Sequence, residues 1–199
     1  LAGRAGMLLW LAVVATAALL ALLHWPELTR NLADRVLQPE NLVVLWLVYP
    51  LVKLLHELAH GFAARLWGGE VHEMGVMLLA FIPIPYVVAS SSAAFPDKRR
   101  RMAVAAAGIA VELFVASIAL FLWLGVEPGR VSAIAYNVLL VGGVSTLLFN
   151  GNPLLRYDGY YILADLIEMP NLAQRGQKYL TYLWDRHVFG APDVDEPQE

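Results

Sequence analysis

Residues 42–67 read LVVLWLVYPLVKLLHELAHGFAARLW, an apolar run with Lys53, His56, Glu57 and His60 embedded in it. The run is long enough to form a helix that crosses the roughly 30 Å hydrocarbon core of a bilayer. Ionisable side chains inside such a helix are costly, so a partner or a function must hold them there. Residues 42–67 therefore predict a membrane-spanning helix that carries a functional site.

Three further apolar runs have a length that fits a membrane span: Met7–Leu23, Met102–Leu124 and Val131–Phe149. The last run breaks at Asn150-Gly151-Asn152-Pro153, and a shorter apolar stretch, Tyr160–Ile167, follows. The chain is 59% hydrophobic and 16% charged, whereas soluble domains are about 45–50% apolar and about 25% charged. We therefore expect an all-α fold, a polytopic helical membrane protein with about four transmembrane helices.

Two segments need a different interpretation. Gly75–Ala89 is apolar but too short for a helical span, and Pro83 and Pro85 interrupt it, so we expect a re-entrant or strand-like membrane loop. Residues 1–169 then form the transmembrane core, and residues 170–199 form a cytoplasmic polar tail or linker, expected to be the cut end of a longer protein. Met7–Leu23 could instead be a signal peptide, but its apolar stretch is long and lacks a small-x-small cleavage site.

Charge and cysteine content exclude several classes of function. The net charge of −3 gives no basic surface for nucleic acid, and the absence of cysteine excludes disulfides and zinc sites built on sulfur. Basic residues also predict the orientation, because they gather on the cytoplasmic side of membrane proteins. One predicted side holds Arg4, Arg65, Lys98, Arg99, Arg100, Arg101, Arg156, Arg175, Lys178 and Arg186, and the other holds Arg30, Arg35 and Arg130. This places the N-terminus in the cytoplasm.

The segment His56-Glu57-Leu58-Ala59-His60 is an H-E-x-x-H motif on a predicted helix. Residues four apart lie on one helical face, so both imidazoles can reach one metal ion. Glu57 can then act as general base toward a water on that metal. A buried His–Glu network without metal is the structural alternative.

A catalytic zinc site usually has three protein ligands, and without cysteine the third must be a carboxylate or a histidine. Asp158 follows the break after the fourth run, while His56 lies about 22 Å along its helix from Asn41. Both residues should therefore reach a similar depth. His72, Glu73 and Glu112 are the competing candidates for the third position.

His56-Glu57-x-x-His60 together with Asn150-x-x-Pro153-x-x-x-x-Asp158-Gly159 resembles the paired signature of site-2-protease-type intramembrane zinc metalloproteases. The resemblance covers residues 42–166 and is strongest to a bacterial subgroup of peptide zinc metalloproteases. It implies that His56, His60 and Asp158 bind Zn²⁺ and that Glu57 activates the water.

The resemblance also implies roles for other residues. Asn150 opens the second motif and would hold the substrate carbonyl or its oxyanion, and the Gly75–Ala89 segment with Pro85 and Tyr86 would pair with an unwound substrate. The chain departs from the wider family's Gly-Pro-x-x-Asn in the third span, where it has Gly108-Ile109-Ala110-Val111-Glu112.

Two ionisable residues remain outside these assigned roles. Glu112 becomes a candidate partner behind the metal ligands or a proton carrier. Lys53, one turn before His56, could pair with Glu112 or act on Glu57; an internal salt bridge or snorkelling is the structural alternative.

The sequence thus predicts an integral membrane protein with its active site open to the cytoplasm, and the resemblance implies that the membrane is the bacterial inner membrane. The expected partners are the lipid bilayer, a membrane protein or peptide substrate, and further domains or subunits beyond this chain. Two other functions compete with the hydrolase: a catalytically inactive zinc-binding scaffold of an export or stress complex, and a metal transporter.

Overall fold

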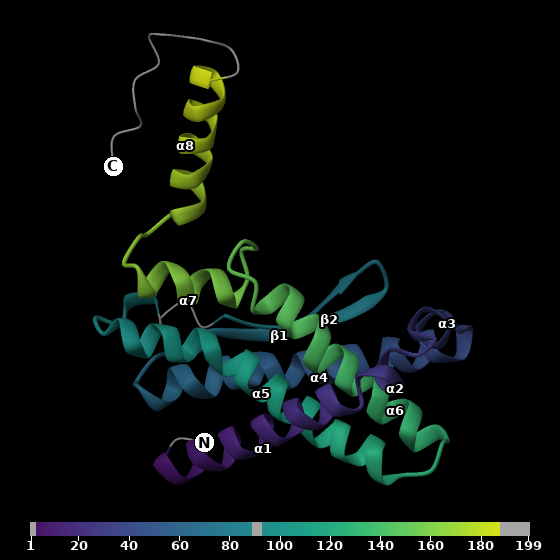
Figure 1. The fold of residues 1–199 in the computed structure, drawn as a ribbon. Coiled ribbons are helices and arrows are strands. Elements are labelled where there is room, and N and C mark those ends of the chain that lie inside the picture. The colour runs from purple at the N-terminus through teal and green to yellow at the C-terminus, as the bar shows by residue number, and fades with distance from the viewer. Residues whose placement is uncertain (1–2, 89–92, 188–199) are drawn as a thin grey trace.

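The computed structural model describes residues 3–88 and 93–187, and Figure 1 shows how its helices form a bundle flanked by a small sheet. The helices are α1 (Arg4–Leu23), α2 (Trp25–Thr29), α3 (Leu32–Leu37), α4 (Pro39–Leu66), α5 (Lys98–Gly125), α6 (Arg130–Leu139), the π-helix η2 (Leu140–Asn150), α7 (Asp158–Leu166) and α8 (Leu172–His187). The strands are β1 (Glu73–Leu79) and β2 (Ile82–Val88).

Four helical segments are long and apolar enough to cross a membrane: α1, α4, α5 and the continuous segment α6–η2. They coincide with the four apolar runs, which confirms that part of the prediction. α1 packs on the bundle with little of its surface buried, and Leu8, Leu22 and Leu23 are 64%, 70% and 66% exposed. Contiguous exposed apolar side chains of this kind are characteristic of protein surfaces that contact lipid or another apolar partner.

α5 lies at the centre of the bundle and packs against α1, α4, α6, η2 and α7. Near one end of α5, Leu120 packs with Ala17 and Tyr136; near the other, Val104 packs with Ala63 and Ala64. Small side chains at such crossings let two helices approach closely. Polar residues of α4, α5 and η2 meet between these two apolar clusters.

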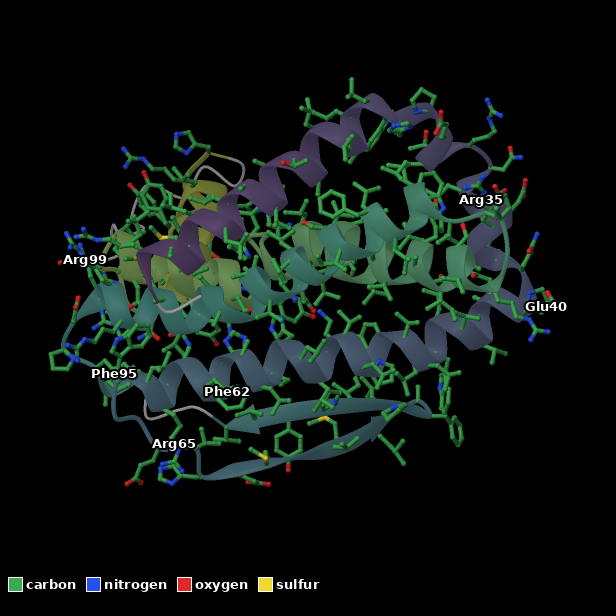
Figure 2. All side chains as sticks on the ribbon, turned by 90° about the horizontal axis from the view of Figure 1, so that it is seen from below. Arg35, Glu40, Phe62, Arg65, Phe95 and Arg99 are labelled. Atoms are coloured by element: carbon green, nitrogen blue, oxygen red, sulfur yellow. The ribbon has the colours of Figure 1, made fainter. Side chains whose placement is uncertain are left out.

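The ends of α4 and α5 are defined by local signals. α4 begins with a proline in its first turn and ends where Gly68 adopts a left-handed φ of 80°, with the Gly69 amide bonded back to the Ala64 carbonyl. The Asp97 carboxylate accepts from the Arg99 amide and caps α5. Figure 2 shows Arg65 and Arg99 at one end of the bundle and Arg35 at the other.

The segment expected to be a re-entrant or strand-like loop is a β-hairpin. β1 pairs with β2 in antiparallel register, with Glu73 opposite Val88 and Leu79 opposite Ile82. The all-α prediction is therefore incomplete, because the fold also contains a two-stranded sheet packed along α4. Ala89, the last residue of the expected segment, lies outside the described residues.

Two prolines fit in β2 because of the direction in which their nitrogens point. The Val87 amide donates to the Glu57 carboxylate at 3.0 Å and thus points away from β1. Since amide direction alternates along an antiparallel strand, Pro83 and Pro85 share the direction of Val87 and break no bond to β1. A proline at an intervening position would have removed a ladder bond.

The expected polar tail contains a helix within the part that the structure describes. α8 covers residues 172–187, and residues 188–199 lie outside the described part. Leu172, Tyr179 and Leu183 recur at spacings of one helical face, a periodicity that the high polar content of this segment conceals.

Candidate metal centre

The two sequence motifs meet in space. α4 carries His56 and His60 one turn apart, and Asp158 is the first residue of α7. The two Nε2 atoms are 2.9 Å apart, His56 Nε2 is 3.0 Å from Asp158 Oδ2, and His60 Nε2 is 3.4 Å from Asp158 Oδ1. Within the described residues, these three form the group able to hold a metal ion.

The donor atoms fit a tetrahedral zinc ion. Ligands at about 2.0–2.1 Å from zinc are about 3.3 Å from one another in a tetrahedron, close to the separations found here. His60 Nδ1 lies 2.7 Å from the Val104 carbonyl and donates to it, so Nε2 is the ring nitrogen left to bind a metal ion. Asp158 Oδ2 is buried with no hydrogen bond of acceptable geometry, although His56 Nε2 is adjacent. A cation among these atoms would satisfy all of them.

The Asp158 carboxyl is ionised over the ordinary pH range. Burial raises its pKa, but the neighbouring His56 and His60 imidazoles outweigh burial and lower the pKa from 3.8 to about 2. The carboxylate is the form that binds a metal ion.

Glu112 of α5 lies behind His56. Its carboxylate is fully buried, and its Oε2 is 3.2 Å from His56 Nδ1, on the side of the ring away from Asp158. Carboxylates at this position fix the tautomer and orientation of metal-binding histidines. The expectation that Glu112 lies behind the metal ligands therefore agrees with the geometry.

Three donors from two segments, α4 and η2, hold Glu112. Lys53 Nζ is 2.7 Å from Oε1, Asn150 Nδ2 is 2.9 Å from Oε2, and Thr146 Oγ1 also donates to Oε2. Lys53 is thus in an internal salt bridge, one of its expected roles, and is not paired with Glu57. Asn150 was expected to face the substrate; in this structure its amide is directed to Glu112 instead.

η2 brings Thr146 and Asn150 to the same carboxylate. Its i+5 bonding is seen where the Gly151 amide donates to the Thr146 carbonyl at 2.8 Å, and π-helical turns are frequent at functional sites. Gly142 permits this packing, because a Cβ there would lie 2.9 Å from the Glu112 carbonyl oxygen. No feature of the sequence predicts this π-helical winding.

Gly108 and Gly159 provide space for the site. A Cβ on Gly108 would lie 2.4–2.6 Å from the His56 ring, and one on Gly159 would lie 2.6 Å from the Gly151 backbone. Both contacts are too close for any side chain. Gly108 therefore lets the His56 imidazole lie against α5, and Gly159 lets α7 begin beside η2.

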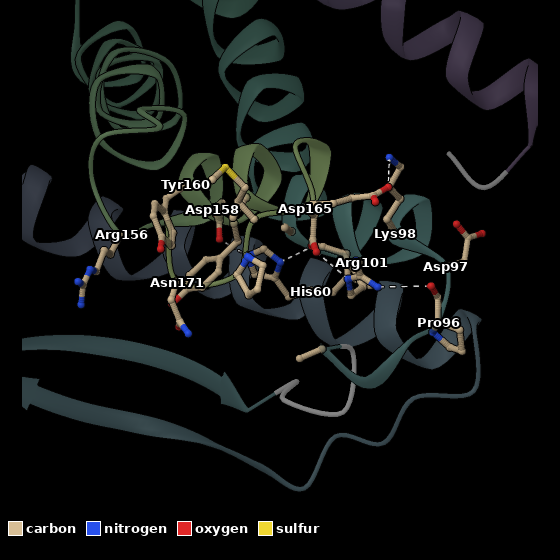
Figure 3. A pocket seen from close by; sticks show the side chains of 18 of the residues that line it. His60, Pro96, Asp97, Lys98, Arg101, Arg156, Asp158, Tyr160, Asp165 and Asn171 are labelled. Carbon is tan, nitrogen blue, oxygen red and sulfur yellow. Dashed lines mark hydrogen bonds and ion pairs between the residues drawn. The ribbon is translucent and has the colours of Figure 1, made fainter. Parts of the chain in front are cut away.

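Glu57 faces an open cleft that reaches the metal centre. The cleft has a volume of about 1280 Å³, and Glu57, His60 and Asp158 lie on its wall. Figure 3 shows His60 and Asp158 on one side of it and the pair formed by Arg101 and Asp165, 2.7 Å apart, on the other. Lys98 and Arg101, interpreted from sequence only as determinants of orientation, thus also bond to α7 and to Glu168 just beyond it.

The remaining candidates lie away from the metal ligands. Tyr86 donates to Glu73 at 2.6 Å on the exposed side of the hairpin, and Pro85 is buried. The hydrogen bond to the Glu73 carboxylate raises the pKa of the Tyr86 hydroxyl above its ordinary value. His72 is exposed and lies 3.7 Å from Glu70. His72 and Glu73 are therefore not third ligands in this structure.

No protein-family model matches the chain, and neither the curated proteins nor the solved structures show a match to it.

Proposed function

We propose that this protein is an intramembrane zinc metalloprotease that hydrolyses peptide bonds of membrane-associated proteins or peptides. The observation that carries the proposal is the meeting of His56, His60 and Asp158, with Glu57 between the two histidines in sequence and facing an open cleft. A third ligand from a distant segment is what a zinc hydrolase requires, and an accidental H-E-x-x-H pattern would lack it.

The bound zinc would polarise the scissile carbonyl and lower the pKa of a water toward about 7. Glu57 is the residue available to take the proton, because it is the carboxylate beside the ligands that is accessible from the cleft. Its Oε2 accepts a hydrogen bond from the Val87 amide of the hairpin, and this bond orients the carboxylate. A water that donates to the same oxygen would compete with the Val87 amide. Glu112 and Lys53 hold His56 in place.

We place the four long apolar helices in the bilayer, with the cleft open to the cytoplasm of a bacterial cell. Arg65 and Arg99 lie at the end of the bundle near the cleft, and Arg35 lies at the opposite end. The excess of basic residues at the cleft end supports a cytoplasmic opening. Water can then reach a site that lies at membrane depth.

The hairpin offers an edge for an unwound substrate. Met74, Val76 and Leu78 lie opposite Val87, Pro85 and Pro83, so their amides and carbonyls point outward from β1. Their side chains are 61–76% exposed. Unpaired backbone groups are costly beside lipid, which favours pairing with an extended peptide. β2 offers no equivalent edge, because two of its outward positions are prolines.

The test uses designed single-span peptides reconstituted in vesicles with the full chain, read by mass spectrometry for new termini. We expect cleavage by the wild type, cleavage that is 10²–10⁴-fold slower, roughly, for Glu57→Gln, and unchanged zinc content in that variant. Cleavage at the wild-type rate by Glu57→Gln would contradict the mechanism. Normal zinc with no cleavage by either protein would favour the inactive scaffold, and zinc flux into the vesicles would favour the transporter.

A second variant tests substrate pairing. Val76→Pro removes one outward amide and leaves the bonds to β2 intact, so it should raise KM with little effect on kcat. Tyr86→Phe, on the same hairpin but not at its edge, is the matched control.

A further inference from the structure

α8 is an amphipathic helix whose apolar face is partly exposed, with Leu172 and Leu183 half-buried. At 100° per residue, Leu172, Tyr179, Leu180 and Leu183 fall within an arc of about 100°. The opposite arc, about 60° wide, holds the polar residues Gln174, Lys178, Thr181 and Asp185. Tyr179 and Leu180 are 48% and 66% exposed. The first turn of α8 is anchored where the Ala173 amide donates to the Tyr160 hydroxyl, and Tyr182 further along the helix is buried.

The direction of α8 differs from that of the long helices. Figure 1 shows α8 running across the direction of α1 and α4, near the end of the bundle at which α1 and α5 begin. A helix oriented this way beside a set of spanning helices lies roughly parallel to the membrane surface. No other described helix or strand packs along its length.

The composition of α8 matches the boundary between headgroups and acyl chains. Three basic residues, Arg175, Lys178 and Arg186, accompany one acidic residue, Asp185. Tyrosine and tryptophan are enriched at this boundary, and α8 carries Tyr179 and Trp184. Basic residues on such a helix are attracted to the anionic lipids of the cytoplasmic leaflet.

We propose that α8 lies in the cytoplasmic interface of the bilayer, with the face formed by Leu172, Tyr179, Leu180 and Leu183 in contact with lipid. Its anchor, the Tyr160 hydroxyl, belongs to α7, whose first residue is Asp158. Binding of α8 to lipid would thus fix the depth of the segment that supplies the third metal ligand. The inference rests on the membrane placement proposed above and is independent of the metal and of proteolysis.

The chain has no cysteine, so single spin labels can be introduced without removing native residues. Leu180→Cys places a label on the apolar face, and Thr181→Cys places one on the polar face one residue away. The full chain is reconstituted in vesicles of phosphatidylcholine mixed with phosphatidylglycerol. The measurement is the accessibility of each label to oxygen, which concentrates in lipid, and to a water-soluble nickel complex.

We expect the label at 180 to favour oxygen and the label at 181 to favour nickel, with a period of about 3.6 residues when the scan is extended over α8. Equal nickel access at both positions would overturn the inference in favour of a solvated helix. Shielding of the label at 180 from both reagents would overturn it in favour of a protein partner. A label on α1, at Leu9→Cys, must favour oxygen; if it does not, the membrane placement itself has failed.

The basic residues provide the matched electrostatic test. Arg175→Gln combined with Lys178→Gln should reduce the oxygen preference at position 180 in vesicles that contain phosphatidylglycerol, and should leave it unchanged in pure phosphatidylcholine. An equal reduction in both lipids would contradict the attraction of these residues to anionic headgroups.

Discussion

Two polar clusters lie between the long helices, and they differ in how completely their hydrogen bonds are satisfied. In the first, Asn137 donates to Asn41 Oδ1 at 2.6 Å, and Asn41 donates back to Asn137 Oδ1 at 3.2 Å. The remaining amide protons reach the carbonyls of Val36 and Ala133. This pair joins α4 to α6 and is complete without any ligand, as expected for polar residues that hold helices together.

The second cluster, around His56 and Asp158, is incomplete. Asp158 Oδ2 is buried without a hydrogen bond of acceptable geometry, and two imidazole nitrogens face each other at 2.9 Å. Such an arrangement is costly in a bundle interior unless a cation is added. The comparison teaches that burial and polarity alone do not identify a site, whereas converging donors that lack partners do.

The largest effect should come from filling the space beside His56. Gly108→Ala puts a methyl group where the imidazole now lies, so His56 must move and zinc binding should be lost. Gly143→Ala is the control, because a Cβ there makes an ordinary contact of 3.6 Å. Zinc content by elemental analysis checks both variants. Full zinc in Gly108→Ala would show that His56 is not held by this contact.

Removing the carboxylate behind His56 should weaken the site without abolishing it. Glu112→Gln should lower zinc affinity by roughly 10–100-fold, the usual cost of losing a partner of a metal-binding histidine. It also leaves Lys53 charged and unpaired, which should reduce thermal stability. Adding Lys53→Met should restore stability but not zinc affinity. Recovery of both in the double variant would mean that Glu112 acts only through Lys53.

Breaking the complete cluster should affect stability alone. Asn137→Ala removes the reciprocal amide pair and should cost about 1 kcal/mol of unfolding free energy. Zinc content should stay at the wild-type value, because the pair lies on a different part of α4 from His56. Unfolding in mixed detergent micelles measures the first quantity, and a fall in zinc would show that the two clusters are coupled.

The smallest effect is expected on the hairpin. Tyr86→Phe removes an exposed hydrogen bond to Glu73 and should leave both melting temperature and zinc content within error of the wild type. A clear loss of zinc would place Tyr86 in the site, contrary to its position in this structure.

Much of the fold could be predicted from sequence, because spans follow from uninterrupted apolar length. The candidate metal site could also be predicted from sequence, because the residue types and spacing of His56, Glu57, His60 and Asp158 fit zinc chemistry. The direction of the Asn150 amide could not be predicted. It depends on the π-helical winding of η2, and no sequence pattern in this segment indicates that winding. The roles of Gly108 and Gly142 were likewise hidden, since a close approach between helices is a tertiary property. The helix α8 was not predicted from sequence, because its apolar residues are few, although they are regularly spaced.

The most direct test of the central claim is the zinc content per chain of detergent-purified wild type, Asp158→Ala and Asn137→Ala. The account predicts about one zinc per chain in the wild type and in Asn137→Ala, and none in Asp158→Ala. Zinc retained by Asp158→Ala would show that the second motif supplies no ligand. A folded wild type that takes up no supplied zinc would contradict the metal centre itself.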